Sequence, residues 1–324
     1  MSAMTLSRVG RGVRIPATRS WAGVVAVLVI GIVVHPLLGR SDENVITSLF
    51  LYIGGAVAWN LIGGFAGQFS LAQSAFIGIG AYTAVMVMLK LGWPAYGALA
   101  AAAVLGALLA LVMGGVLFRL RGAYFTIGSL AFALAALSWM TIWPFTGATQ
   151  GLSAPIALAP DPSTLFTIAL ILAVVGIATS VAVFHSPYGL RLMAIRDDEE
   201  VADSLGVAPF ATKLGILVIS GILTAAVGAG FALQSISIEP FSAFSINWTI
   251  SFVVMSIVGG LGTIWGPVIG AVIIYYGLTV QLQSFPTLSS VVSGLLIIVL
   301  ITFLPNGVLG GARRLLDRLR RPPS

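Results

Sequence analysis

The feature that most constrains this chain is a succession of long apolar stretches that contain almost no charged residue. Of its 324 residues, 58% are hydrophobic and only 8% are Asp, Glu, Lys or Arg. A soluble domain carries about 25% charged residues. So few charges cannot cover a water-facing surface, and lipid must therefore cover most of it. The sequence predicts an integral membrane protein.

Hydropathy predicts an all-α integral membrane protein, a polytopic bundle of about ten transmembrane helices. Each apolar stretch has about the 20 residues that a helix needs to cross the hydrocarbon core. Helices are expected because lipid offers the backbone no hydrogen-bond partners, and a closed barrel needs an alternation of polarity that these stretches lack. The predicted spans are 21–38, 45–66, 71–89, 94–117, 123–143, 164–184, 213–235, 247–265, 267–283 and 288–305.

Basic residues orient these spans. When the N-terminus is placed in the cytoplasm, the 16 Lys and Arg residues all fall inside except Arg40 and Lys90. This bias predicts an even number of spans with both termini cytoplasmic. Residues 1–20 and 311–324 are then basic tails, and residues 21–310 form one transmembrane domain. The net charge of +6 flanks membrane spans, so it indicates topology in the lipid bilayer and gives no reason to expect a nucleic acid partner.

Groups that catalyse reactions or bind metals are scarce. The chain has no Cys and only two His, His35 and His185, which are too far apart for a helical metal pair. Every Asp and Glu lies in a predicted loop or tail, so neither paired intramembrane carboxylates nor a Ser-His-Asp cluster is expected. We therefore expect no enzyme activity, no metal site and no cofactor on this chain.

The same scarcity bears on how transport would be driven. Ion-coupled transporters usually place ionisable side chains inside the bilayer, and no strong candidate stands in these spans. Backbone carbonyls alone can hold sodium, so an ion-coupled secondary transporter or a passive channel for small polar solutes stays an alternative. Neither Lys90 nor Lys213 stands in a P-loop pattern. If ATP drives transport, another chain must hydrolyse it.

The inside loop 185–213 is the longest hydrophilic segment. Residues 186–189 (SPYG) predict a turn, and the stretch from Asp197 to Leu205 predicts a short helix with its acidic residues at the N-terminal end, where they complement the helix dipole. Gly206 supplies a C-terminal stop, and Pro209 follows. This helix is either a solvated surface element or a coupling segment that docks into a cytoplasmic partner.

Two Gly-rich sequences stand at the inside ends of predicted spans. They are residues 63–67 (GGFAG) and residues 259–262 (GGLG). Transporters often contain repeated halves with broken helices near the substrate path. Glycine is common in membrane helices, however, so chance similarity explains the pair equally well.

Several motifs resemble one transporter family. Residues 200–206 (EVADSLG) resemble the EAAxxxG coupling motif of ABC importer permeases, with Val201 in place of the first Ala. Longer matches run in family order over roughly residues 55–310. They are NLIGGFAGQFSL (60–71), AFIGIGAY (75–82), LRGAYFTI (120–127), TGATQGLS (146–153), SPYG (186–189), AIRDDE (194–199) and GGLGTIWGP (259–267). Together they resemble the M-type (LivM-like) permease subunits of branched-chain amino acid ABC importers.

This resemblance implies a role for the chain. It would be the membrane-spanning subunit of an importer in a prokaryotic inner membrane, carrying branched-chain or related amino acids inward. Its partners would be a second, LivH-like permease subunit, two ATP-binding subunits and an extracytoplasmic substrate-binding protein. ATP and Mg would be bound by the partner ATPase subunits. The cargo stays open among branched-chain amino acids, other amino acids, amides and urea.

Two sets of candidate residues follow. The resemblance implies that coupling to the ATPase uses Arg196, Asp197, Asp198, Glu199, Glu200, Asp203, Leu205 and Gly206. Polar residues in or near the spans are candidates for the translocation path, namely Asn60, Gln68, Ser70, Gln73, Ser74, Thr126, Ser129, Asn247, Thr249 and Ser251. The alternative for each of these is an ordinary interhelical hydrogen bond, worth about 0.6 kcal/mol.

Overall fold

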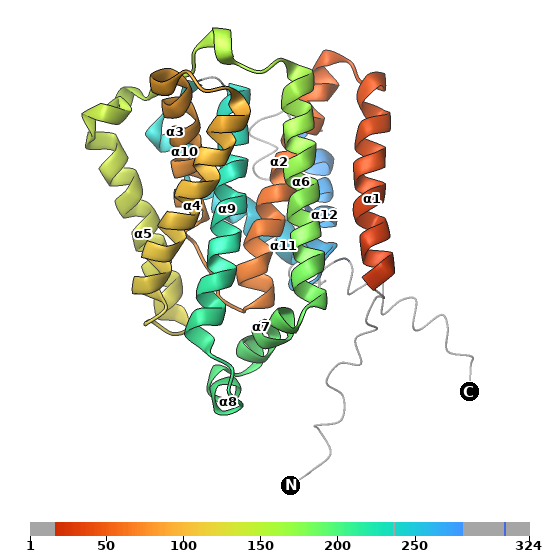
Figure 1. Ribbon diagram of the computed structural model, residues 1–324, viewed down its shortest axis with the longest axis vertical. Helices are drawn as coiled ribbons and strands as arrows, with labels where there is room; N and C mark the ends of the chain where they lie inside the picture. The colour runs from red at the N-terminus through yellow and green to blue at the C-terminus, as the bar shows by residue number, and fades with distance from the viewer. Residues whose placement is uncertain (1–16, 236, 281–307, 309–324) are drawn as a thin grey trace.

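A computed structural model describes residues 17–235, 237–280 and 308, and it shows a bundle of long helices (Figure 1). Within that part of the chain, eight helices are long and apolar enough to cross a membrane. They comprise α1 (Ala17–Val34), α2 (Arg40–Asn60), α3 (Gln73–Leu91), α4 (Ala95–Leu117), α5 (Ala123–Ile142), α6 (Pro162–His185), α9 (Pro209–Ser235) and the pair α10 (Pro240–Ala243) and α11 (Ile246–Gly260). The predicted all-α polytopic fold is confirmed.

The predicted spans agree with these helices except near their ends. Helix α2 begins at Arg40, earlier than expected, because Asp42 and Glu43 lie in its first turn and favour a helix N-terminus. It continues as η3 (Leu61–Phe65). Helix α11 ends at Gly260, before the predicted residue 265, because residues 261–265 form a turn in which Gly262 has φ +72°.

The last two predicted spans are covered only in part. The span predicted at 267–283 corresponds to α12 (Gly266–Ala271) and η7 (Val272–Val280), which form a shorter apolar helix. The span predicted at 288–305 lies outside the described residues, as do residues 1–16 and 311–324 of the two predicted tails. Helix α1 begins at Ala17, within the stretch expected to be the N-terminal tail.

The connections gather at two ends of the bundle. One end, which we call the basic end, carries α7 (Pro187–Asp197) and α8 (Glu199–Ser204), at the bottom of Figure 1. At the opposite end, β1 (Leu152–Ser153) pairs antiparallel with β2 (Ser237–Ile238). The short helices η2 (His35–Leu37), η4 (Pro144–Thr146), η5 (Ala148–Gln150) and η6 (Ile156–Leu158) belong to connections at that end.

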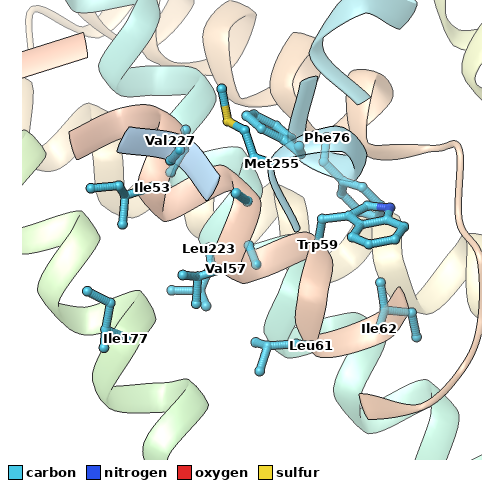
Figure 2. Close-up of a cluster of buried hydrophobic side chains, with 14 of the residues drawn as sticks. Ile53, Val57, Trp59, Leu61, Ile62, Phe76, Ile177, Leu223, Val227 and Met255 are labelled. Atoms are coloured by element: carbon cyan, nitrogen blue, oxygen red, sulfur yellow. The ribbon is translucent and has the colours of Figure 1, made fainter. Parts of the chain in front are cut away.

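The apolar core lies between α2, α6, α9 and α11, with α3 against its edge. Figure 2 shows part of it, with labelled side chains that come from all five helices. Burial separates inner from outer helices. In the most apolar stretch of each helix, 78% of α9 is buried, whereas only 28% of α4 and 17% of α1 are buried. The outer helices expose apolar side chains, as lipid-facing helices do.

Helices α3 and α9 pack closely because small residues face each other. A Cβ atom on Gly80 would collide with the backbone of Ala225, and Gly228 lies equally close to the backbone of Ile77. In lipid, such small residues let helices approach without help from the hydrophobic effect. The N-terminal end of α3 is thereby fixed deep in the bundle.

Replacing Gly80 tests this packing. We expect Gly80→Val to lower the thermal unfolding midpoint in mild detergent, because overpacking a close contact costs about 1–3 kcal/mol. Gly115→Val is the matched control, since a Cβ atom there meets nothing within 4 Å. Equal midpoints for the two variants would contradict the packing described here.

Candidate coupling segment and translocation path

The α7–α8 segment consists of two capped helices where the sequence predicted a turn and one helix. Ser186 caps α7 by accepting a hydrogen bond from the N–H of Gly189, with Pro187 as the first helical residue. Asp198 is extended, with φ −159°, and its carboxylate accepts from the N–H groups of Glu200 and Val201. Because Asp198 is an N-cap, the predicted helix 197–205 is interrupted there, and α8 begins at Glu199.

The α7–α8 segment is fixed to the beginning of α9. The fully buried Lys213 donates to Glu199 at 2.7 Å, and its Nζ lies 5.4 Å from the centre of the Phe118 ring. Tyr188 donates from its hydroxyl to the carbonyl of Thr212 at 2.6 Å. Burial raises the pKa of the Tyr188 hydroxyl above its ordinary value. These contacts tie the segment to the N-terminal turn of α9.

The outer side of α8 presents apolar and acidic side chains to solvent. Val201 is 55% exposed and Leu205 is 78% exposed, and Asp203 lies between them along the helix. Glu200 is also exposed and pairs with Arg121 at 2.9 Å. Exposed apolar residues on a short, firmly held helix suit contact with another protein.

Arg196 contacts the end of a span. Its Nη1 donates to the carbonyl oxygen of Gly64 in η3 at 2.6 Å. Beside it, the buried Asn60 accepts from the N–H of Gly262 at 2.9 Å and donates to the carbonyl of Thr263 at 3.0 Å. The two Gly-rich sequences noted above therefore lie against each other, joined by Asn60.

Residues 66–72 connect α2 to α3 without regular structure and reach well into the bundle. Gly67 lies against Arg196 at the basic end. Gln73, at the start of α3, donates to Ser220 at 3.0 Å. Ser220 lies roughly 16 Å along α9 from Pro209, at about 1.5 Å per residue. Helix α3 is thus preceded by an irregular segment at membrane depth, where backbone groups need partners inside the protein.

Polar side chains supply those partners. Trp59 donates from Nε1 to the carbonyl of Ser70 at 2.9 Å, and Thr126 donates to the carbonyl of Phe69 at 2.9 Å. Ser129 accepts from the N–H of Leu71 at 2.8 Å. Several residues considered for the translocation path therefore hold this segment in place.

A second set of bonds joins the segment to α11 and leaves two polar groups unpaired. Thr249 donates to the carbonyl of Leu71 at 3.4 Å and accepts from the N–H of Ser74, in the first turn of α3, at 2.9 Å. Gln73 Oε1 and Ser74 Oγ are buried and have no hydrogen-bond partner among the described residues. Gln68 is half-buried within the segment. Gln73 and Ser74 are therefore path candidates with buried polar atoms that have no partner among the described residues.

The remaining two path candidates, Asn247 and Ser251, line a wide-open, shallow cavity of about 260 Å³ toward the opposite end. Tyr52 and Trp248 also line it, and their rings lie 5.8 Å apart within a cluster that includes Phe231. Sequence reasoning missed both aromatic residues, since each stands in an apolar stretch and only the tertiary contact distinguishes it from a core residue. The cavity has no charged residue among its described lining.

No group of three or more His, Cys, Asp or Glu that could hold a metal ion is found among the described residues. The side chains that are present suit two kinds of contact. One is protein docking at α8, and the other is contact with a neutral or zwitterionic solute along hydroxyl, amide and aromatic groups.

The pair of adjacent carboxylates on α8 gives a stability test. We expect Glu199→Gln to lower the unfolding midpoint clearly, because removing one partner of a buried ion pair costs about 3–5 kcal/mol, less here since Glu199 is partly exposed. Glu200→Gln is the control, because its exposed pair with Arg121 is worth about 0–1 kcal/mol. A larger loss from Glu200→Gln in the same thermal assay would contradict the assignment.

Comparisons with known proteins identify the family of this chain. A family model described as branched-chain amino acid transport system / permease component matches residues 42–301. Two relatives are named high-affinity branched-chain amino acid transport system permease protein LivM, one from Escherichia coli (strain K12) and one from Salmonella typhimurium (strain LT2). Each is 24% identical over 318 residues, covering 88% of this chain and 74% of the relative.

No solved structure matches the chain. The family match covers most of the sequence, and with the apolar helices it makes the protein a multi-pass inner-membrane protein. The chain belongs to the family of permease components of branched-chain amino acid transport systems.

Proposed function

We propose that this chain is the membrane-spanning permease subunit of an ABC importer that carries branched-chain or related amino acids inward. ATP hydrolysis on separate ATPase subunits would power the transport. Family membership supports the substrate class, and the named relatives are high-affinity permeases of the same kind of system. The basic end, which carries Arg119, Arg121, Arg191, Arg196 and Lys213, would face the cytoplasm.

The observation that carries this proposal is the form of the α7–α8 segment. It projects from the basic end, exposes Val201 and Leu205, and is fixed to α9 by a buried ion pair. A firmly attached helix can transmit a displacement by a cytoplasmic partner to the spans. A loosely attached helix would move without displacing them. The expected partners are two ATP-binding subunits, with a second permease in the membrane and a substrate-binding protein outside. ATP and Mg would belong to the ATP-binding subunits.

The translocation path is proposed to run from the aromatic cavity toward residues 66–72. Tyr52 and Trp248 at the cavity would receive an aliphatic side chain, while Asn247 and Ser251 would meet the polar groups of the amino acid. The described lining is neutral, which suits a zwitterion that must leave as readily as it enters. Gln68, Gln73 and Ser74 would serve the deeper part of the path.

Purification from native membranes followed by reconstitution tests the proposal. We expect the chain to co-purify with ATP-binding subunits and a second permease, and the complex in liposomes to take up leucine only with ATP and the binding protein. An ion-coupled transporter would instead accumulate substrate with this chain alone under a proton or sodium gradient. A passive channel would give downhill flux without ATP. Either of these results would overturn the proposal.

Gly206 tests the role of α8 in coupling. Gly206 ends α8 with φ +84°, where a side chain costs about 1–2 kcal/mol in backbone strain although nothing lies within 4 Å of the added atom. We expect Gly206→Val to shift the end of α8 and to reduce ATP-driven uptake severalfold, with the complex still inserted in the membrane.

The matched control for Gly206 is Gly92→Val. Gly92 has φ +67° and open space around it, but it ends α3 at the opposite end of the bundle. We expect normal uptake from this variant in the same liposome assay. Equal losses of uptake in both variants would mean that general strain, and not coupling, explains the effect.

A further inference from the structure

Arg196 stands where the α7–α8 segment meets the ends of the spans. It lies in the last turn of α7, and its guanidinium reaches out of that helix to the carbonyl of Gly64. Gly64 belongs to η3, the continuation of α2, and the last carbonyls of a helix have no partner within it. A cation at this place also complements the negative end of the helix dipole. Arg196 therefore caps α2 although it belongs to α7.

Two further chain segments lie against the same side chain. A Cβ atom on Gly67 would collide with the aliphatic part of Arg196, and one on Gly262 would collide with its guanidinium. Gly67 begins the irregular segment before α3, and Gly262 lies in the turn between α11 and α12. Both have positive φ values, +68° and +72°. One side chain thus contacts α2, the segment leading to α3, and the turn after α11.

The bonds at this junction differ in how easily they can change. Asn60, which joins α2 to the turn at Gly262 and Thr263, is fully buried, so its two hydrogen bonds cannot be exchanged for bonds to water. Arg196 is exposed at the basic end, so its hydrogen bond to Gly64 is the solvent-accessible link between α7 and this junction. Asn60 holds the span ends together, and Arg196 connects that unit to the α7–α8 segment.

We infer that Arg196 transmits the displacement of the α7–α8 segment to the inner ends of α2 and α11 and thereby sets the opening of the path at the basic end. It acts as a positioning residue and does not touch the cargo. This inference deepens the proposed function and rests on it. The competing role for an exposed arginine on this segment is direct contact with the ATPase, and the two roles predict different results.

The experiment uses the complete importer in liposomes, with leucine uptake and ATP hydrolysis measured on the same sample. We expect Arg196→Gln to reduce the leucine taken up per ATP hydrolysed by about tenfold, the effect of losing one charge-assisted hydrogen bond. ATP-binding subunits should co-purify as before, and hydrolysis should continue. Arg196→Lys retains a cation that can donate to Gly64, so it should restore part of the coupling.

Arg191→Gln is the matched control. Arg191 is an exposed arginine on the same helix, and this variant removes the same charge without touching the span ends. Uptake per ATP should stay within about twofold of the wild type, as for exposed charges in general.

A structural readout separates transmission from mere support. The chain has no Cys, so a single Cys at the partly exposed Leu261, in the turn beside Gly262, can be labelled selectively. ATP binding should change its labelling rate in the wild type and in Arg191→Gln, but not in Arg196→Gln.

A normal nucleotide response and normal coupling in Arg196→Gln would overturn the inference. Loss of the ATP-binding subunits from this variant would also overturn it, in favour of direct docking. If the wild-type complex shows no ATP-driven uptake, the proposed function itself fails.

Discussion

The constraint on which this structure depends is that each backbone polar group at membrane depth must find a partner inside the protein. Residues 66–72 break the helical pattern between α2 and α3, so their N–H and C=O groups cannot bond within a helix. Side chains of Trp59, Thr126, Ser129 and Thr249 bond to that region instead. The chain has few polar residues, and several of them supply hydrogen-bond partners to this one short segment. This indicates that the irregular backbone is needed there.

That segment also explains why distant parts of the sequence meet at the basic end. Its first residues lie against Arg196 of α7, and its last lead to Gln73 beside α9. Asn60 joins α2 to the turn after α11. The α7–α8 segment, the ends of the spans and the candidate path therefore form one connected unit. Docking of a cytoplasmic partner at Val201 and Leu205 would act on this unit as a whole.

Much of the fold could be predicted from the sequence, because hydropathy and chain length decide which stretches cross a membrane. The break between α7 and α8 at Asp198 could not be predicted, because an Asp within an acidic run can equally well be a first-turn residue or an N-cap. The partners of Ser129 and Thr249 lie on other helices, and spacing along one helix gives no information about them. Tyr52 and Trp248 were missed for the same reason. The similarity of the two Gly-rich sequences, 63–67 and 259–262, could not be distinguished from chance in the sequence, but in the structure the two are in contact.

The most direct test of this account is a set of spin-label distances in the assembled transporter with and without ATP. Labels would replace Leu205 on α8, Leu261 in the turn after α11, and Trp93 at the opposite end, which are all exposed or partly exposed. The account predicts that the distance between positions 205 and 261 stays constant while the distance between positions 261 and 93 changes when ATP binds. A change between 205 and 261, with 261 and 93 fixed, would show that α8 moves without the spans and would contradict it.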